Sequence, residues 1–278
     1  VTSTIVVAGE AMLDQLWGYD SAGAGMVANV GADLRMCESL VADNGGAGIV
    51  VDGAVITLER SVIRGHSGNS QPGVGIAVLR GSEPASASIE ASVIDDNEQS
   101  GLFVRGATAT VSGSVISNTR TLSGSFGRGI QAQADAEGGS DVVVAGSLIA
   151  GNHEANVAAV GSRVTVRDSS LHDARDNGVD HGYAAFAGIG TGLNGELVIE
   201  RTVIVGFARS GVFVIEGDAQ LEGVVIENDR AAAPDWGAGV TLAGGGGYAT
   251  SARIAGSAIA DVELFGILLA ERLVFPFE

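Results

Sequence analysis

The chain has 278 residues, and its 33 acidic residues outnumber its 15 lysines and arginines to give a formal net charge of −18. Such a charge disfavours nucleic acids, anionic lipids and heavily charged acidic glycans as partners, because like charges repel at long range. The most apolar stretch, residues 265–277, is too short to span a bilayer and is interrupted by Glu271 and Arg272. Membrane insertion is therefore not expected.

A short motif, a small residue followed by two apolar residues, recurs along the whole chain, and its spacing alternates between about 22 and about 32 residues. This alternation predicts a repeat of two coils, of which one is minimal and the next carries insertions. The first residues of the successive motifs are Glu10 (a degenerate copy), Ser39, Ser61, Ser92, Ser114, Ser147, Ser170, Thr202, Val224 and Ser257.

Each repeat contains short runs in which apolar and polar residues alternate, separated by glycine-rich corners, as in residues 100–121. A coil this short cannot bury its own apolar side chains, so successive coils must stack to form a core. The sequence therefore predicts an all-β fold, a single-stranded right-handed parallel β-helix of about ten coils. Minimal coils of about 22 residues alternate with expanded coils of about 32 residues. We expect one domain over residues 1–278.

In chain order, residues 1–12 are expected to open inside a repeat, with Ile5, Val6 and Val7 in the second strand of a coil. Long loops are expected to project from one flank at intervals of two coils, because the expanded coils alternate with minimal ones. They begin near Leu13, Arg64, Ser117, His172 and Glu227, and the expanded coils carry a second insertion, as at 81–88 and 135–141.

The two ends of the predicted rod differ from its middle. Residues 264–269 are expected to form the last strand, and residues 264–278 together are expected to supply that strand and a C-terminal lid. An uncovered terminal coil exposes unpaired backbone groups and core side chains, which promotes association. We therefore expect self-association through the coil ends, including head-to-tail filaments.

The Ser or Thr that opens each motif is expected at a turn, where stacked hydroxyls can bond to neighbouring backbone groups along the rod. Val224 interrupts this ladder, which a purely structural role tolerates. Cys37 is the only cysteine in the chain, so no intrachain disulfide can form.

The repeats in residues 127–176, GRGIQAQ, VVVAGSLIAGN and VTVRDSSLHDARD, resemble those of uncharacterised right-handed parallel β-helix repeat proteins of myxobacteria. These proteins share the pectate-lyase-like fold, and the similarity extends over nearly the whole chain. The resemblance implies an extracellular or cell-surface location. It implies no particular reaction, because this fold carries lyases, hydrolases, epimerases, adhesins and scaffolds.

Residues 172–183 are the one segment in which imidazoles, carboxylates, an arginine and a phenol concentrate. Carboxylates near a histidine can perform acid–base chemistry or bind a hard cation such as calcium, although the spacing matches no zinc or calcium loop. The alternative is a solvated polar loop, with no metal site. The candidate catalytic residues are His172, Asp173, Asp176, Asp180 and His181.

Five aromatic residues are expected on the long loops of the same flank. Aromatic side chains along a groove commonly stack on neutral sugars or anchor partner proteins. Alternatively, each ring covers the apolar underside of its own loop. The candidate binding residues are Trp17, Tyr19, Phe126, Tyr183 and Trp236.

These observations favour a non-catalytic, secreted or cell-surface β-solenoid with a structural or binding role, adhesive or filament-forming. The alternative is a polysaccharide-active enzyme, a lyase or hydrolase, or a glycan-binding module that uses the flank of long loops. Expected partners are further copies of the chain, other surface proteins and neutral glycans. An enzyme needs convergent polar groups in one concave site, whereas in a scaffold the loops fill their own space.

Overall fold

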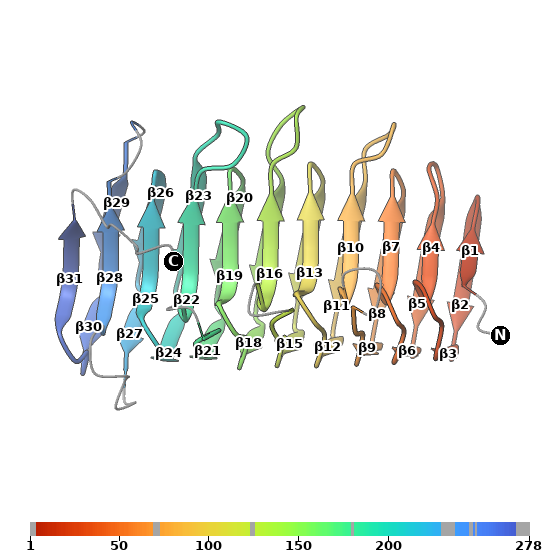
Figure 1. The fold of residues 1–278 in the computed structure, drawn as a ribbon, viewed down its shortest axis with the longest axis horizontal. Coiled ribbons are helices and arrows are strands. Elements are labelled where there is room, and N and C mark those ends of the chain that lie inside the picture. The colour runs from red at the N-terminus through yellow and green to blue at the C-terminus, as the bar shows by residue number, and fades with distance from the viewer. Residues whose placement is uncertain are drawn as a thin grey trace.

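The computed structural model describes residues 4–68, 73–122, 126–178, 181–228, 237–244, 247 and 249–270. These residues form three parallel β-sheets of 11, 10 and 10 strands, which we call sheets A, B and C (Figure 1). Each coil contributes one strand to each sheet in turn. The predicted all-β parallel β-helix of about ten coils is therefore confirmed.

Sheet A consists of β1 (Ile5–Val7), β4 (Met26–Ala28), β7 (Ile49–Asp52), β10 (Ile76–Leu79), β13 (Ser100–Arg105), β16 (Arg128–Gln133), β19 (Ala155–Val160), β22 (Tyr183–Gly188), β25 (Ser210–Ile215), β28 (Ala238–Ala243) and β31 (Phe265–Ala270). Sheet B consists of β2 (Glu10–Asp14), β5 (Asp33–Cys37), β8 (Val55–Glu59), β11 (Ser86–Glu90), β14 (Thr108–Ser112), β17 (Asp141–Ala145), β20 (Arg163–Arg167), β23 (Gly195–Glu200), β26 (Gly217–Glu222) and β29 (Ser251–Ala255). Sheet C consists of β3 (Trp17–Tyr19), β6 (Leu40–Ala42), β9 (Val62–Arg64), β12 (Val93–Asp95), β15 (Val115–Ser117), β18 (Leu148–Ala150), β21 (Ser170–Ala174), β24 (Val203–Phe207), β27 (Val225–Glu227) and β30 (Ala258–Ala260).

Equivalent residues of successive coils lie directly beside one another, because every strand pairs in parallel with its counterpart in the next coil. Ile76, for example, pairs with Ile49 on one side and Leu102 on the other. All three side chains point inward and are fully buried. The core is thus a set of columns in which each apolar side chain packs on the equivalent side chain of its neighbour.

The predicted hydroxyl ladder runs along the entry to sheet C. The Ser61 N–H donates to Ser92 Oγ at 3.1 Å, and the Ser92 N–H donates to Ser114 Oγ at 3.0 Å. Each hydroxyl in turn donates to the carbonyl two residues earlier, as Ser92 does to Glu90 at 2.8 Å. The ladder therefore satisfies two backbone groups per coil inside the turn.

A column of glycines stands where the chain enters sheet A. A Cβ added at Gly48 would lie 2.6 Å from the Gly75 carbonyl oxygen, and one added at Gly75 would lie 2.5 Å from that of Gly101. Real Cβ atoms do not approach backbone oxygens so closely. The recurrent glycine therefore reflects close approach of the coils at this corner.

The sequence interpretation of the first coil is wrong in its register. Residues 5–7 form β1, which pairs with β4 in sheet A, so they are a first strand and not a second one. The predicted loop near Leu13 contains strand β3, and the Leu16 N–H donates to Ser39 Oγ, so Leu16 and not Glu10 occupies the ladder position. An Ile-Val-Val triplet fits any strand, and local pattern alone could not assign its sheet.

A second register error concerns the motif at Ser170. The Ser147 N–H donates to Ser169 Oγ, so Ser169 is the ladder residue, and Ser170 is the outward residue of β21. His172 and Asp173 consequently belong to β21 rather than to a loop. Two adjacent serines made the choice ambiguous from sequence.

The other predicted long loops are placed as expected. The connections 65–75, 118–127, 175–182 and 228–237 each lead from sheet C to sheet A, and they recur at every second coil. The matching insertions 80–85, 134–140, 189–194 and 244–250 lead from sheet A to sheet B (Figure 1). Both sets enter or leave the same strands of sheet A.

The predicted lid, residues 272–278, lies outside the described residues. In β31 the core-facing Ile267 and Leu269 are 51% and 72% exposed. Self-association through the coil ends stays a prediction. No helix capable of crossing a membrane occurs within the described ranges.

We expect Gly48→Ala to lower the free energy of unfolding by about 3 kcal/mol, because the new methyl group would overlap His66 and the Gly75 carbonyl. Chemical denaturation measures this change. Gly18→Ala is the matched control, since a Cβ there meets nothing within 4 Å and should change stability by less than about 0.5 kcal/mol. Equal effects of the two substitutions would contradict the close-approach explanation.

Replacing Ser92 by Ala should cost about 1–3 kcal/mol, because it removes one acceptor and one donor from the buried ladder. Ser88→Ala in the same coil serves as the control, since Ser88 is an exposed residue of sheet B. Thermal unfolding followed by circular dichroism compares the two. A melting temperature unchanged in Ser92→Ala would rule out a stabilising role for the ladder.

Candidate functional site

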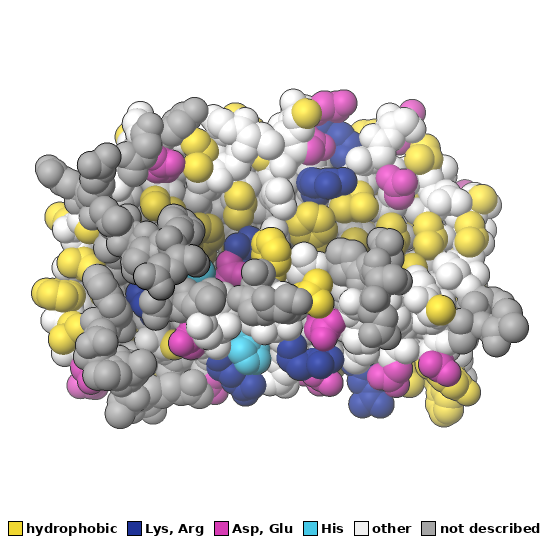
Figure 2. All heavy atoms as spheres, in the orientation of Figure 1, with side chains coloured by type: hydrophobic (Ala, Val, Ile, Leu, Met, Phe, Trp, Pro, Cys, Tyr) yellow, Lys and Arg dark blue, Asp and Glu magenta, His cyan; other side chains and the backbone are white. Residues whose placement is uncertain are grey.

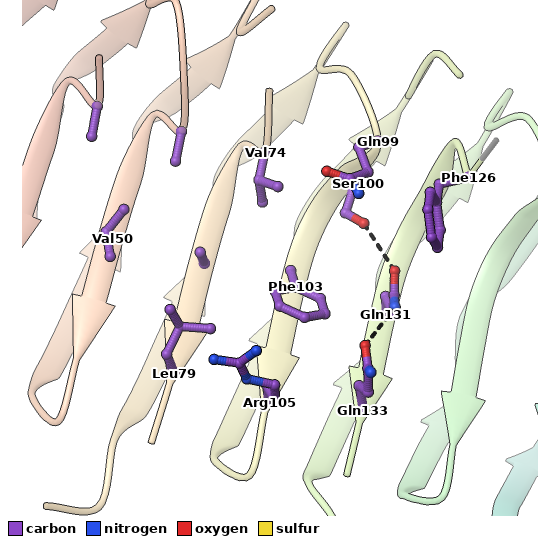
Figure 3. Close-up of a pocket in the computed structure, with 13 residues that line it drawn as sticks. Val50, Val74, Leu79, Gln99, Ser100, Phe103, Arg105, Phe126, Gln131 and Gln133 are labelled. Atoms are coloured by element: carbon purple, nitrogen blue, oxygen red, sulfur yellow. Dashed lines mark hydrogen bonds between the residues drawn. The ribbon is translucent and has the colours of Figure 1, made fainter. Parts of the chain in front are cut away.

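The insertions that lead to sheet B border the outer face of sheet A along one edge (Figure 1). Val74 and Phe126, which belong to the connections from sheet C, lie at its other edge (Figure 3). Figure 2 shows hydrophobic side chains gathered along the middle of this face, with charged side chains toward its two margins. We call the outward face of the strands of sheet A, between these two edges, the trough, and its strands the floor.

The size of the outward side chains changes abruptly along one column of this floor. Val50 pairs with Ala77, Ala77 with Phe103, and Phe103 with Gln131. The small Ala77 leaves a hollow that Val50 borders on one side and Phe103 on the other. Because the strand spacing is fixed at about 4.8 Å, neighbouring residues cannot move together to fill it.

The hollow is a pocket of about 500 Å³ (Figure 3). Its lining is mostly apolar, with a few polar groups on the side of β13 and β16. The described residues that line it are Ala24, Ala47, Val50, Val74, Ala77, Leu79, Gln99, Ser100, Phe103, Arg105, Phe126, Gln131 and Gln133.

A chain of hydrogen bonds fixes the polar side of the pocket. Ser100 Oγ donates to Gln131 Oε1 at 3.2 Å, and Gln131 Nε2 donates to Gln133 Oε1 at 3.1 Å (Figure 3). Ser100 and Gln131 are buried, at 1% and 5% exposure. Their orientation is therefore set before any ligand arrives, while the Gln133 amide nitrogen ends the chain as a donor.

Arg105 lies two residues after Phe103 on β13. It is the only charged residue among the described residues of the lining. At the other end of the pocket, the Arg128 guanidinium lies 5.1 Å from the centre of the Phe126 ring. Arg128 also forms a largely buried ion pair with Glu154. This pair holds the Arg128 side chain, and the cation–π contact helps to orient Phe126 at the rim.

Two coils beyond Gln131, the outward side chains of the same column pack against one another and leave no hollow between them. Phe186 and Phe213 pair across β22 and β25, and both stack with Tyr183, with ring centres 4.7 Å apart for Tyr183 and Phe213. Tyr183 and Phe213 are each only 4% exposed. These rings fill the surface with their own contacts, whereas Phe103 lies between Ala77 and Gln131 and lines the pocket with its ring.

The structure separates the candidate catalytic residues. His172 Nε2 lies 2.8 Å from Ser170 Oγ on the outward side of β21. Asp176 Oδ1 accepts the N–H of Gly178 at 2.8 Å, which is a local turn contact. Asp173 lies in β21 with a φ of 53°, and Asp180 lies outside the described residues.

His181 instead packs at the edge of the aromatic cluster. Its ring meets that of Tyr183 edge-on at 5.7 Å, and Nδ1 lies 3.1 Å from the Asn177 amide nitrogen. Burial is the largest cause that lowers the pKa of His181 below its ordinary value, although Glu154 acts in the opposite direction. The arrangement is that of a packed side chain, and the described part of the segment brings no carboxylate within hydrogen-bond distance of the ring.

The candidate aromatic residues are also separated. Trp17 and Tyr19 lie on β3 of sheet C, 73% and 69% exposed, so their predicted position on the loop flank is wrong. Tyr183 is a buried residue of β22 rather than a loop residue. Phe126 alone lines the pocket, and Trp236 lies outside the described residues.

Sequence reasoning missed Phe103, Arg105, Gln131 and Gln133. The signal was present in the alignment of coils, since a column of Val, Ala, Phe and Gln departs from a smooth series. Among the described residues, no group of three or more His, Cys, Asp or Glu could hold a metal ion. The calcium considered from the sequence therefore finds no ligand set among them.

Comparisons with known proteins agree with this architecture. A model of the family described as right handed beta helix region matches residues 74–259, which is more than half of the chain. A comparison with curated protein sequences gives no match. Three solved structures with low sequence identity are similar in fold.

The first is an alginate lyase from Paenibacillus sp. str. FPU-7, with 13% identity, a TM-score of 0.47, and coverage of 93% of this chain and 98% of that chain. The catalytic domain of a GH87 alpha-1,3-glucanase in complex with nigerose has 12% identity, a TM-score of 0.38, and coverage of 88% and 49%. Pectate lyase Pel9A has 12% identity, a TM-score of 0.33, and coverage of 86% and 56%. The chain thus spans about half of the latter two.

Identities of 12–13% and TM-scores below 0.5 carry no conclusion about the activity of this chain. The family match supports the right-handed β-helix part of the resemblance seen in the sequence, and nothing in the comparisons supports a myxobacterial origin. With three parallel sheets stacked coil on coil and a family match over most of its length, the chain belongs to the right-handed β-helix family.

Proposed function

We propose that this protein is a non-catalytic glycan-binding β-solenoid that holds a neutral sugar chain in the trough over sheet A. The observation that carries the proposal is the pocket above Ala77, which combines an aromatic ring, aliphatic walls and preoriented amides. Sugar rings present an apolar face and a rim of hydroxyls, and they are bound by surfaces of this mixed character. The long-loop flank predicted as the binding surface contributes Phe126 to this pocket.

The stacked rings further along the trough show how Phe103 differs from the other outward aromatic residues. Phe186 and Phe213 stack on each other, whereas Phe103 has only the small side chain of Ala77 on one side. An apolar ring held beside a hollow gains from a ligand that covers it, because that contact removes both surfaces from water. Phe103 is therefore the expected stacking platform, and Phe126 forms the rim above it.

Neutral glycans fit the charge of the protein better than polyanions. The formal net charge of −18 repels a heavily charged acidic polymer at long range. Within the pocket, the Gln133 amide and Arg105 donate hydrogen bonds to ring and hydroxyl oxygens without requiring a charged partner. Other surface proteins and further copies of the chain remain proposed partners at other surfaces.

A second candidate is glycan cleavage, and one observation favours it. Glu154, whose side chain is only 10% exposed, lies with Arg128 next to Phe126, and its charge acts on His181. A buried carboxylate near an imidazole can transfer protons. The ion pair with Arg128 opposes this role, because it already occupies the Glu154 carboxylate. We therefore rank binding above cleavage.

The extracellular or cell-surface location implied by the resemblance is part of the same proposal, since long polysaccharides occur there. Cell fractionation with an antibody against the chain tests it. Recovery of the protein only from the cytosol would contradict a role on external glycans.

Replacing Phe103 by Ala should weaken binding of a neutral oligosaccharide at least about tenfold, which corresponds to ~1.4 kcal/mol. The ring supplies the stacking surface, and its loss leaves aliphatic side chains and the rim residue Phe126 as the apolar lining. Gln131→Leu should also weaken binding, because it removes the amide that links Ser100 to Gln133. Calorimetric titration with cellohexaose, xylohexaose and mannohexaose measures these changes.

Tyr19→Ala is the control variant, since Tyr19 is an exposed aromatic residue on sheet C and should not affect binding. Parallel titrations with calcium and with a chelator show whether the cation contributes. Release of new reducing ends by the wild type, abolished in Glu154→Gln, would favour cleavage over binding. Unchanged affinity in Phe103→Ala would place the ligand elsewhere.

A further inference from the structure

A buried histidine lies beneath one wall of the pocket. His66 is fully buried in the connection from β9 to β10, at a position where adjacent coils place Asn44 and Asn97. These side chains form a polar ladder inside the corner. The backbone N–H of Asn44 donates to His66 Nδ1 at 3.1 Å, and the backbone N–H of His66 donates to Asn97 Oδ1 at 3.3 Å.

This ladder requires the neutral imidazole. Nδ1 must carry a lone pair to accept the Asn44 N–H, so the ring proton is on Nε2. Nε2 has no hydrogen-bond partner among the described residues and faces Gly48, where an added Cβ would lie 2.3 Å from it. A second proton on Nδ1 would place two N–H groups head-on and leave a buried cation.

No charged neighbour compensates such a cation. Within the described structure, the ring's Nδ1 contacts only Asn44, through its backbone N–H and its side-chain amide. A backbone hydrogen bond with Val41 opposes the effect of burial on the ring without supplying a charge. The acidic side chains nearby are engaged elsewhere or exposed. Glu98 accepts the N–H of Gly68, and Asp95 bonds to Ser117. The charged residues on the segments packed around the ring are Asp43, Arg64, Asp95, Asp96, Glu98 and Arg120.

The same corner builds the wall of the pocket. The Gly48 N–H donates to the Val74 carbonyl at 2.8 Å, and the Gly75 N–H donates to the Ser100 carbonyl at 3.0 Å. Val74 and Ser100 line the pocket, as does Ala47 beside Gly48. Any opening of the corner to hydrate His66 must disturb these contacts.

We propose that His66 is an acid-sensitive latch, so that proton uptake by its buried ring opens the corner carrying Ala47 and Val74 and releases a ligand from the pocket. The release step rests on the proposed glycan-binding function, whereas the opening step does not. Open and closed forms differ in how tightly they bind one proton, and that difference couples pH to the state of the wall.

Burial lowers the pKa of His66 from its ordinary 6.5 to about 4 in the closed form. The open form therefore binds the proton more tightly, and the closed form is fully stable above pH 6.5 and loses stability as pH falls from 6.5 to about 4. At pH 5.0 this difference makes opening about 30-fold more favourable than at neutral pH.

Amide hydrogen exchange, corrected for intrinsic rates, tests the opening step at pH 7.5 and 5.0. We expect the opening equilibrium of residues 73–78 to rise about 30-fold in the wild type and to change little in His66→Asn, which restores the residue of the adjacent rungs. His181→Asn is the matched control and should keep the wild-type response. An acid response that persists in His66→Asn, or none in the wild type, overturns the latch.

Titration of the wild type with cellohexaose, xylohexaose and mannohexaose at both pH values tests the release step. Affinity should fall at pH 5.0 in the wild type and hold in His66→Asn. Opening without any change in affinity would overturn release. If none of the three sugars binds at pH 7.5, the proposed function fails, and hydrogen exchange alone decides the latch.

Discussion

The parallel pairing of each coil with the next is the constraint on which the rest of this structure depends. It fixes equivalent residues about 4.8 Å apart, so that every side chain meets the same position of the coils before and after it. Ile49, Ile76 and Leu102 form one such column in the core. A residue is thus tolerated according to its neighbours in the column more than according to its neighbours in sequence.

The alternation of minimal and expanded coils follows from this constraint and generates the candidate site. Insertions can be added only at corners, because additional residues within a strand would break the pairing. Every second coil adds length on both sides of sheet A, as between Leu79 and Ser86. The floor of the resulting trough stays regular, so that its chemistry is decided by a few outward residues such as Ala77 and Phe103.

The sequence predicted the architecture well because the repeat is visible in the regular spacing of its motif. Alternating apolar residues and recurrent serines sufficed for the β-helix, the coil count and the hydroxyl ladder. Register failed where the local pattern was ambiguous, at the Ile-Val-Val triplet of β1 and at the serine pair 169–170. The site could not be predicted from loop composition, because the pocket arises on strands β7, β10, β13 and β16, between residues about one coil apart in sequence.

Departures from regular columns are of two kinds, and the difference indicates which of them carry function. Val224 cannot accept the Thr202 N–H, yet its side chain is completely buried, and that burial offsets the lost hydrogen bond. Phe186 and Phe213 likewise cover each other by stacking. Ala77 and His66 have no such compensation, since one leaves a hollow and the other a buried nitrogen without a hydrogen-bond partner among the described residues. The two lie close together, since His66 is in the connection that leads into β10 and Ala77 is on β10 itself. Ala77 lines the pocket, and His66 lies behind the lining residues Ala47 and Val74. Uncompensated departures that adjoin one pocket are the ones to which we assign function.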